Sequence, residues 1–269
     1  MPAEPPSAVA TSGEVWKLGT HRLLCGDATS GDSLKSVLDG QRAYMVFTNP
    51  PYNVAYRQDS GRSRVGLREI ANDNLGTAFE QFLRAACARM LSVTEGAVYI
   101  CMSSSELHTL HRAFTAAGGH WSTYLIWDKG HFTLGRSDYH RQYEPILYGW
   151  REGGEHYWCG ARDLGDVWCV PKPQANALHP TMKPVALVER AIRNSSRRGD
   201  VVLDPFGGSG STLIACEKTG RRACLVELVP QYVDVIIRRW EGYTDQKAHR
   251  ESDGCSFSEL VQQRLLVGV

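Results

Sequence analysis

A short motif of an amide, two prolines and an aromatic residue follows an apolar run in this chain of 269 residues. The run covers residues 43–47, Thr48 follows it, and the motif is Asn49-Pro50-Pro51-Tyr52. Two consecutive prolines end a β-ladder, because each lacks an N–H donor and has a fixed φ. We therefore expect a strand that ends at Thr48, with Asn49 at the C-terminal tip, where open α/β sheets bind ligands. An amide oxygen, a proline carbonyl and a stacking ring suit a flat base held by its exocyclic amine; a plain turn with a packed Tyr is the alternative.

A glycine-rich segment, residues 204–212, follows a second apolar run at residues 201–203. Its glycines allow a tight turn and a close approach of the backbone to a ligand, and a helix is expected to begin at Ser211. A Walker phosphate loop is excluded because no Lys precedes the Ser-Thr pair, and the dinucleotide pattern Gly-x-Gly-x-x-Gly is incomplete. Glu227 ends the next apolar run, 17 residues after Gly210. An acid at such a strand end is placed to accept hydrogen bonds from ribose hydroxyls.

The two motifs together carry a resemblance to one enzyme family. Residues 49–52 resemble the catalytic tetrapeptide of the DNA amino-methyltransferases, which modify adenine N6 or cytosine N4. Residues 204–212 resemble the S-adenosylmethionine loop of that family, with its Phe-x-Gly-x-Gly core. The catalytic motif comes before the cofactor loop, which resembles the permuted order of the family's beta group. The resemblance implies an α/β fold with a doubly wound, mostly parallel Rossmann-like sheet of about seven strands and a circularly permuted motif order.

The resemblance also implies roles for individual residues. The catalytic residues would be Asn49, Pro50, Pro51 and Tyr52. The residues implied to bind the cofactor, S-adenosyl-L-methionine, are Asp27, Thr181, Lys183, Asp204, Phe206, Gly208, Gly210, Ser211, Thr212 and Glu227. Two of these positions have a plainer interpretation: the Gly-Asp pair at 26–27 could be only a turn, and the segment His-Pro-Thr-Met-Lys-Pro at 179–184 only a helix start. No metal site is expected, because the eight Cys residues form no Cys-x-x-Cys pair.

The function that this resemblance implies is transfer of a methyl group from S-adenosylmethionine to N6 of an adenine flipped out of double-stranded DNA. Cytosine-N4 methylation is the alternative, because Asn49 stands where adenine-specific members of the beta group often carry Asp. A catalytically inactive relative that binds cofactor or DNA for regulation is a further alternative of a different class. The intact residues Asn49, Tyr52, Gly208, Gly210 and Glu227 favour an enzyme.

Two segments are candidates for contact with DNA. Residues 53–76 form a long polar segment beside Tyr52, either a solvated loop or a loop that neutralises phosphates. Its arginines are Arg57, Arg62, Arg64 and Arg68. Residues 128–178 occupy the interval in which the resembled family carries its target-recognition segment, and Glu144 occupies a place where that family tends to carry an acid of no assigned role. Because this interval is short, we expect a short or relaxed recognition sequence.

The remaining patterns indicate the elements that would position these residues. Two apolar runs around Gly19 and Thr20 predict a hairpin over residues 15–25, and apolar residues at helical spacing predict a helix over residues 79–91. Further strands are expected at residues 97–102, 121–127, 143–150 and 223–227, and further helices after Pro184 and over residues 230–240. An alternation of strands and helices is typical of a doubly wound sheet.

Length and composition predict one methyltransferase domain, residues 13–240, between a disordered tail at 1–12 and a C-terminal extension at 241–269. The net charge of +1 provides no strong overall field, so DNA must be held by local basic patches. No apolar run reaches the roughly 20 residues of a membrane span, and scattered, unpaired cysteines are typical of the cytoplasm, here of a bacterial or phage-infected cell. The expected partner is double-stranded DNA, and the expected state is a monomer or a homodimer.

Overall fold

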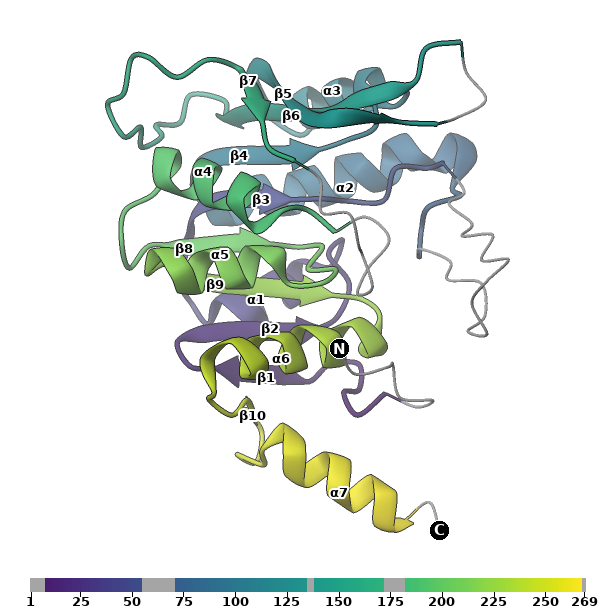
Figure 1. The fold of residues 1–269 in the computed structure, drawn as a ribbon, viewed down its shortest axis with the longest axis vertical. Coiled ribbons are helices and arrows are strands. Elements are labelled where there is room, and N and C mark those ends of the chain that lie inside the picture. The colour runs from purple at the N-terminus through teal and green to yellow at the C-terminus, as the bar shows by residue number, and fades with distance from the viewer. Residues whose placement is uncertain (1–7, 55–70, 135–137, 172–181, 268–269) are drawn as a thin grey trace.

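A single mixed sheet forms the centre of the protein (Figure 1). The computed structural model describes residues 8–54, 71–134, 138–171 and 182–267. Ten strands lie side by side in the order β10 (His249–Arg250), β1 (Val15–Leu18), β2 (His21–Cys25), β9 (Arg222–Glu227), β8 (Val201–Asp204), β3 (Ala43–Thr48), β4 (Thr94–Cys101), β6 (Arg141–Arg151), β5 (Gly119–Thr133) and β7 (Val167–Cys169).

The central strands of this sheet are parallel. Neighbours from β2 through β9, β8 and β3 to β4 all pair in parallel, whereas β6 pairs antiparallel with both β4 and β5. The predicted doubly wound, mostly parallel α/β fold is therefore confirmed. The sheet has more strands than the sequence predicted, because β7 and β10 add short edge strands of 3 and 2 residues. Strands this short show no periodic pattern in a sequence.

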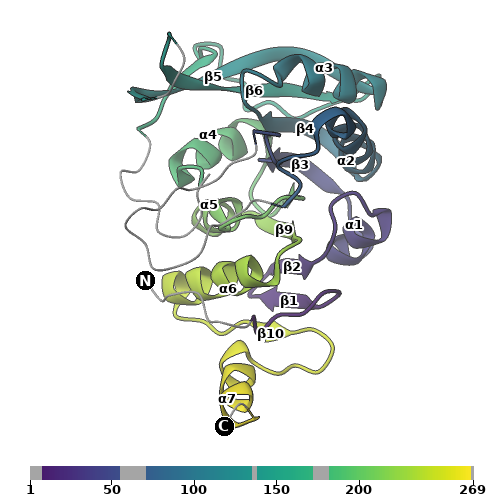
Figure 2. The same cartoon turned by 90° about the vertical axis from the view of Figure 1, so that its right-hand side faces the viewer.

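Helices cover both faces of the sheet, as Figure 2 shows. One face carries α4 (Val185–Ser195), α5 (Ser211–Thr219) and α6 (Pro230–Thr244), and the other carries α1 (Gly31–Leu38), α2 (Phe79–Val93) and α3 (Leu107–Ala116). A short 3-10 turn, η1 (Gly76–Ala78), precedes α2. The predicted helix is confirmed as α2, which buries its periodic apolar residues against the sheet. The predicted hairpin is also confirmed, since β1 and β2 pair antiparallel across the turn at Gly19 and Thr20.

The N-terminal segment is attached to the domain from residue 8 onward. Val9 and Ala10 are buried, and their backbone N–H groups donate to the carboxylate of Asp234 in α6 at 2.7 and 2.9 Å. A buried carboxylate requires such donors, and here they come from the opposite end of the chain. The expectation of a disordered tail over residues 1–12 is therefore wrong for residues 8–12, and residues 1–7 lie outside the described residues.

The C-terminal segment is also part of the fold. The predicted boundary at residue 240 falls inside α6, which continues to Thr244. Beyond it, β10 pairs with β1, and α7 (Phe257–Val267) projects from that edge of the sheet (Figure 1). Phe257 is buried against Trp16 with ring centroids 5.6 Å apart. Within the described ranges, no helix has the length and apolar character needed to cross a membrane.

Candidate active site

One cleft lies at the C-terminal ends of the parallel strands and contains both sequence motifs. Its volume is about 420 Å³, and its wall includes Asn49 and Tyr52, which follow β3, as well as Asp27, which follows β2, and Glu227, which ends β9. This volume is within the range of small-molecule sites, and the position is where parallel α/β sheets bind ligands. The tertiary structure therefore brings the tetrapeptide and the glycine loop together, although about 150 residues separate them along the chain.

Asp204 connects the two motifs. The hydroxyls of Thr48 and Thr212 donate to its two carboxylate oxygens at 2.7 and 2.6 Å, and the backbone N–H of Phe206 donates at 3.1 Å. Burial raises the pKa of Asp204 to about 6. Because both oxygens are bonded to protein groups, Asp204 holds the ends of β3 and β8 in register beside the cleft.

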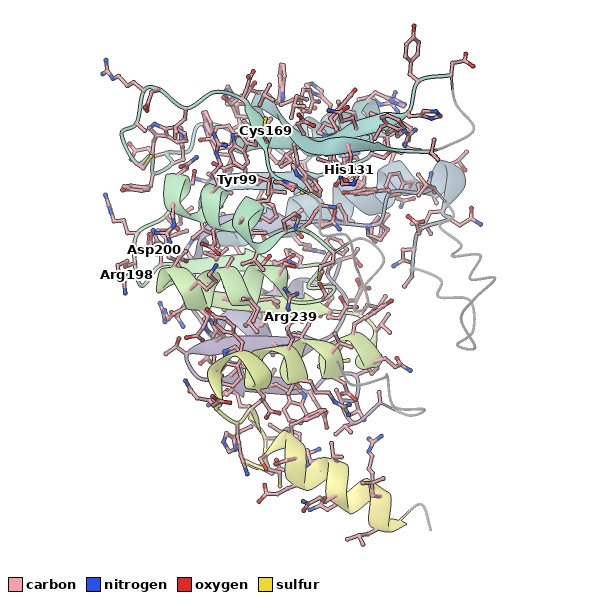
Figure 3. All side chains as sticks on the ribbon, viewed as in Figure 1. Tyr99, His131, Cys169, Arg198, Asp200 and Arg239 are labelled. Atoms are coloured by element: carbon pink, nitrogen blue, oxygen red, sulfur yellow. The ribbon has the colours of Figure 1, made fainter. Side chains whose placement is uncertain are left out.

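The glycine loop starts α5 without a side-chain cap. Gly210 is the N-cap residue in a left-handed conformation, with φ 77°, and a Cβ there would lie 3.1 Å from Ile236. A larger residue would be both strained and crowded at this position. Arg239 of α6, which lies between α5 and α6 in Figure 3, donates to the carbonyl of Ser209 at 2.8 Å. Arg239 therefore fixes the loop from the side of α6, and residues of the same loop line the cleft.

Glu227 lies at the end of β9, as the sequence predicted. Its carboxylate accepts hydrogen bonds from the backbone N–H groups of Gly208 at 2.7 Å and Val229 at 2.9 Å. Burial raises the pKa of Glu227 to about 7, although these two N–H donors oppose the shift. Each carboxylate oxygen accepts more than one hydrogen bond, so the bonds to the backbone leave acceptor capacity toward the cleft.

Two further predicted cofactor residues lie beside these elements. Asp27 borders the cleft and is exposed; its Oδ1 accepts from the backbone N–H and the hydroxyl of Thr29, both at 2.8 Å. This is the turn geometry that the plainer interpretation of the Gly-Asp pair predicts. Phe206 also borders the cleft and packs on Phe82, with ring centroids 5.9 Å apart.

Tyr52 is bonded through its hydroxyl at the other end of the cleft. The phenol oxygen lies 2.5 Å from Oδ1 of Asn49, 2.5 Å from Oε1 of Glu144 and 2.9 Å from Nζ of Lys183. Burial, followed by the negative charge of Glu144, raises the pKa of Tyr52 well above its usual value. Tyr52 is therefore a neutral phenol at physiological pH, fixed in position beside Asn49.

Glu144 and two lysines form a buried ionic cluster behind Tyr52. Lys183 lies 2.6 Å and Lys129 lies 3.1 Å from its carboxylate, and all three side chains are at most 12% exposed. Burial alone would raise the pKa of Glu144, but the charges of Lys183 and Lys129 outweigh it and lower the pKa to about 2. The carboxylate is therefore ionised, and a carboxylate so deeply buried requires such partners.

Sequence reasoning assigned no role to Glu144 and did not select Lys129. A signal for Glu144 is present, since an acid next to the apolar end of a buried strand requires a partner. Lys183 was predicted to bind the cofactor, and the structure places its ammonium 2.6 Å from Glu144 and 2.9 Å from the hydroxyl of Tyr52. Lys183 is linked to the glycine loop by its backbone carbonyl, which accepts from the hydroxyl of Ser211 at 2.8 Å.

Several predicted residues cannot be placed. Thr181, Arg57, Arg62, Arg64 and Arg68 lie outside the described residues. Among the residues that the structure describes, no group of three or more His, Cys, Asp or Glu side chains could hold a metal ion.

Comparison with known proteins identifies the family. The model of the family described as DNA methylase, which comprises N6 and N4 amino-methyltransferases, matches residues 43–238. The chain therefore belongs to this family, and fold and family together define an S-adenosyl-L-methionine-dependent DNA methyltransferase of the amino-methylating class. The resemblance inferred from the two motifs is confirmed.

Individual relatives agree with this assignment. The chain is 25% identical over 266 residues to the DNA adenine methyltransferase YhdJ of Escherichia coli, with 81% of this chain and 86% of YhdJ covered. The structure of TTHA0409 from Thermus thermophilus, complexed with S-adenosyl-L-methionine, is 25% identical with a TM-score of 0.59 and covers 88% of this chain and 96% of its own. The structure of the cytosine-N4-specific PvuII DNA methyltransferase is 16% identical with a TM-score of 0.64. The match covers 97% of this chain and 96% of the PvuII enzyme and shows a likeness of fold alone.

Proposed function

We propose that this methyltransferase transfers a methyl group to N6 of adenine in a base flipped out of double-stranded DNA. The observation that carries the proposal is that one cleft is lined by the amide of Asn49, the ring of Tyr52, the glycine loop and Glu227. Adenine is favoured over cytosine because the adenine methyltransferase YhdJ is similar over most of both chains, whereas the cytosine-N4 enzyme shares the fold only. Cytosine-N4 methylation remains the alternative outcome of the test, since an amide acceptor suits either amine.

The cleft has features that fit S-adenosyl-L-methionine. A ribose would meet the Glu227 carboxylate at the end of β9, and Asp27 stands beside it on the same wall. Gly208, Gly210, Ser211 and Thr212 surround the start of α5, where backbone N–H groups and the helix dipole favour a carboxylate. Phe206 contributes an aromatic wall, Asp204 positions the loop, and the backbone carbonyl of Lys183 is bonded to Ser211 at the start of α5. Thr181, which lies outside the described residues, stays an expected cofactor residue.

The chemistry follows from the acceptors beside Tyr52. The exocyclic amine of adenine is a poor nucleophile because its lone pair is conjugated with the ring. If the amide oxygen of Asn49 and the carbonyl of Pro50 accept its two hydrogens, the nitrogen approaches tetrahedral geometry and its lone pair becomes available. When bound, S-adenosylmethionine supplies an electrophilic methyl group, and its sulfur keeps the electrons of the bond that breaks. The amine forms the new N–C bond and releases one proton to water, so positioning and electrostatics are the main contributions of the protein.

A flipped base also requires a stacking surface. The ring of Tyr52 borders the cleft next to Pro51, and its hydroxyl is anchored. Aromatic faces stack on any base, and extrusion of a base from the duplex costs a few kcal/mol that such contacts offset. We assign Tyr52 to this contact.

The proposed target-recognition segment, residues 128–178, is described over 128–134 and 138–171, and it includes the ends of β5 and β6 that face each other across their connection. Near these ends, Phe132 and His140 stack with ring centroids 5.3 Å apart while Phe132 stays 54% exposed and Tyr139 91% exposed. Arg141, the first residue of β6, borders the cleft and donates to the hydroxyl of Ser103 at 2.9 Å. Exposed rings and a cation next to the cleft suit DNA, together with the loop arginines of residues 53–76. The enzyme would act in the cytoplasm, where bacterial or phage DNA is found.

Incubation with isotope-labelled S-adenosylmethionine and double-stranded DNA, followed by mass spectrometry of the nucleosides, tests this proposal. The expected product is N6-methyl-2′-deoxyadenosine; N4-methyl-2′-deoxycytidine would establish the alternative, and absence of both in a folded, cofactor-binding protein would favour a regulator. Sequencing of methylated genomic DNA tests the recognition proposal. We expect a short motif or little preference beyond the target base, and a motif of five or more fixed bases would contradict it.

A further inference from the structure

The hydroxyl of Tyr52 has one proton and three close neighbours. Two of them are oxygens, on Asn49 and Glu144, each 2.5 Å away, and the third is the ammonium of Lys183 at 2.9 Å. A phenol donates one hydrogen bond and an ammonium only donates, so Lys183 donates to the phenol oxygen. Two oxygens at 2.5 Å require a proton between them. The single phenol proton cannot serve both Asn49 and Glu144.

We propose that the Tyr52 phenol donates its hydrogen bond to Glu144. Glu144 thereby orients the amide of Asn49, with the amide N–H toward Tyr52 and the carbonyl oxygen toward the target amine. Glu144 is then a positioning residue, which acts on the reacting amine through Tyr52 and Asn49. The inference rests on the proposed function, because it assigns the freed carbonyl oxygen of Asn49 to the amine of the base.

The negative charge of Glu144 decides whether its carboxylate or the amide oxygen of Asn49 accepts the hydrogen bond of the phenol. Lys183 and Lys129 hold the carboxylate ionised, so it can only accept, and a charged acceptor forms a stronger hydrogen bond than an amide oxygen. The amide of Asn49 has both a donor and an acceptor, and a rotation of about 180° exchanges them with little movement of other atoms. With its nitrogen toward the phenol, all three neighbours of the Tyr52 oxygen are satisfied.

This arrangement explains why an amide suits position 49 in this chain. A carboxylate at position 49 would be a second group that only accepts, and it would compete with Glu144 for the same proton. An Asn49→Asp variant should therefore be impaired while Glu144 is present. Glu144→Gln supplies an N–H donor to the phenol oxygen, which leaves the phenol proton for the new carboxylate, so this second change should restore part of the activity.

A double-mutant cycle between Glu144 and Tyr52 is the main test. We measure kcat at saturating DNA and cofactor, the Kd of S-adenosylmethionine by calorimetry, and Tm. Glu144→Gln should lower kcat about 10-fold in the wild-type background, but less than about 3-fold when Tyr52→Phe has already removed the phenol. Both ion pairs of Glu144 are lost in both backgrounds, so the part of their effect that does not depend on the phenol cancels in the cycle. Cofactor Kd should change little.

Glu189→Gln is the matched control. Glu189 of α4 forms ion pairs with Lys218 of α5 and Arg193 of α4 and does not border the cleft, so its replacement should leave kcat unchanged. If Glu144→Gln does not fold, Tyr52→Phe alone serves, because it removes the hydroxyl and keeps both ion pairs. We expect Tyr52→Phe to lower kcat about 10-fold in a protein that still folds, with some loss of Tm because Glu144 and Lys183 each lose a hydrogen-bond partner.

Three results would overturn the proposal: an equal loss from Glu144→Gln in both backgrounds, no restoration of Asn49→Asp by Glu144→Gln, or wild-type kcat in Tyr52→Phe. Asn49→Ala separates this failure from failure of the proposed function. Normal methyl transfer by Asn49→Ala would remove the catalytic assignment itself. An inactive Asn49→Ala together with an uncoupled cycle would remove only the role of Glu144.

Discussion

The hydroxyl of Thr48 donates a 2.7 Å hydrogen bond to the carboxylate of Asp204, and this bond joins the two halves of the site. Thr48 is the last residue of β3, directly before Asn49, and Asp204 is the last residue of β8, directly before the glycine loop. The two strands are neighbours in the sheet and pair in parallel. A buried contact between the last residues of β3 and β8 therefore holds the tetrapeptide next to the glycine loop.

Replacement of Thr48 with Val tests this connection. The change keeps the shape of the side chain but leaves the buried Asp204 carboxylate with one donor fewer, so we expect a loss of about 1–3 kcal/mol in the free energy of unfolding. Denaturant unfolding measures it. Thr123→Val, a change at a side chain whose hydroxyl bonds only the next residue's carbonyl, is the control. A Thr48→Val protein as stable as wild type would show that Thr212 and Phe206 are sufficient for Asp204.

Asn49→Ala should abolish most methyl transfer. It removes one proposed acceptor for the target amine and leaves the glycine loop intact, and removal of a preorganised group of this kind costs about 3 kcal/mol or more of transition-state stabilisation, a fall in kcat of at least about 100-fold. Calorimetry should find the affinity for S-adenosylmethionine nearly unchanged. Turnover close to that of the wild type would remove Asn49 from the catalytic residues.

Glu227→Ala should weaken cofactor binding. Hydrogen bonds from ribose hydroxyls to a carboxylate are charge-assisted and contribute about 1.5–3 kcal/mol, so Kd should rise about 10-fold or more. Calorimetry on a variant whose circular dichroism matches the wild type provides the measurement. Because Glu227 also accepts from Gly208 and Val229, the Glu227→Gln variant, which retains an acceptor oxygen, is the comparison. An unchanged Kd in Glu227→Ala would make the residue purely structural.

The affinity for the cofactor should depend on pH through Glu227. Burial raises its pKa to about 7, so the free protein carries a neutral acid at pH 6 and a carboxylate at pH 8. Ribose hydroxyls donate more strongly to the carboxylate, and binding below pH 7 must release its proton. Kd should therefore fall by up to about 10-fold between pH 6 and pH 8. Glu227→Gln does not titrate and should reduce this dependence; the same slope in that variant would assign it to another group.

Asp234→Ala should destabilise the protein through its N-terminal segment. Asp234 is fully buried and accepts from the N–H groups of Val9 and Ala10, so its loss leaves two buried donors without their acceptor. We expect a loss of about 1–3 kcal/mol in the free energy of unfolding, with earlier proteolysis near residue 10. Asp32→Ala, at a side chain that is 98% exposed, is the control and should change little. Equal stability of the two variants would show that the segment is not held by Asp234.

Local patterns were sufficient for much of the fold and for half of the site. The double proline after residues 43–48, the glycines after residues 201–204 and the acid after residues 223–227 each mark the end of a strand. Parallel strands place such ends at one edge of a sheet, so their common position followed from the α/β pattern. The helix α2 and the β1–β2 hairpin were equally predictable, because each is formed by residues that follow one another along the chain.

The sequence by itself determined the family, the fold class and the residues at both ends of the cleft. Only the tertiary structure brought together Lys129 of β5, Glu144 of β6 and Lys183 before α4, and only it joined Val9 to Asp234. The physical reason is that a buried charge is stabilised by whichever opposite charges or donors the packed chain places against it, at any separation in sequence. Periodicity and turn chemistry act over a few residues, so they carry no information about such partners.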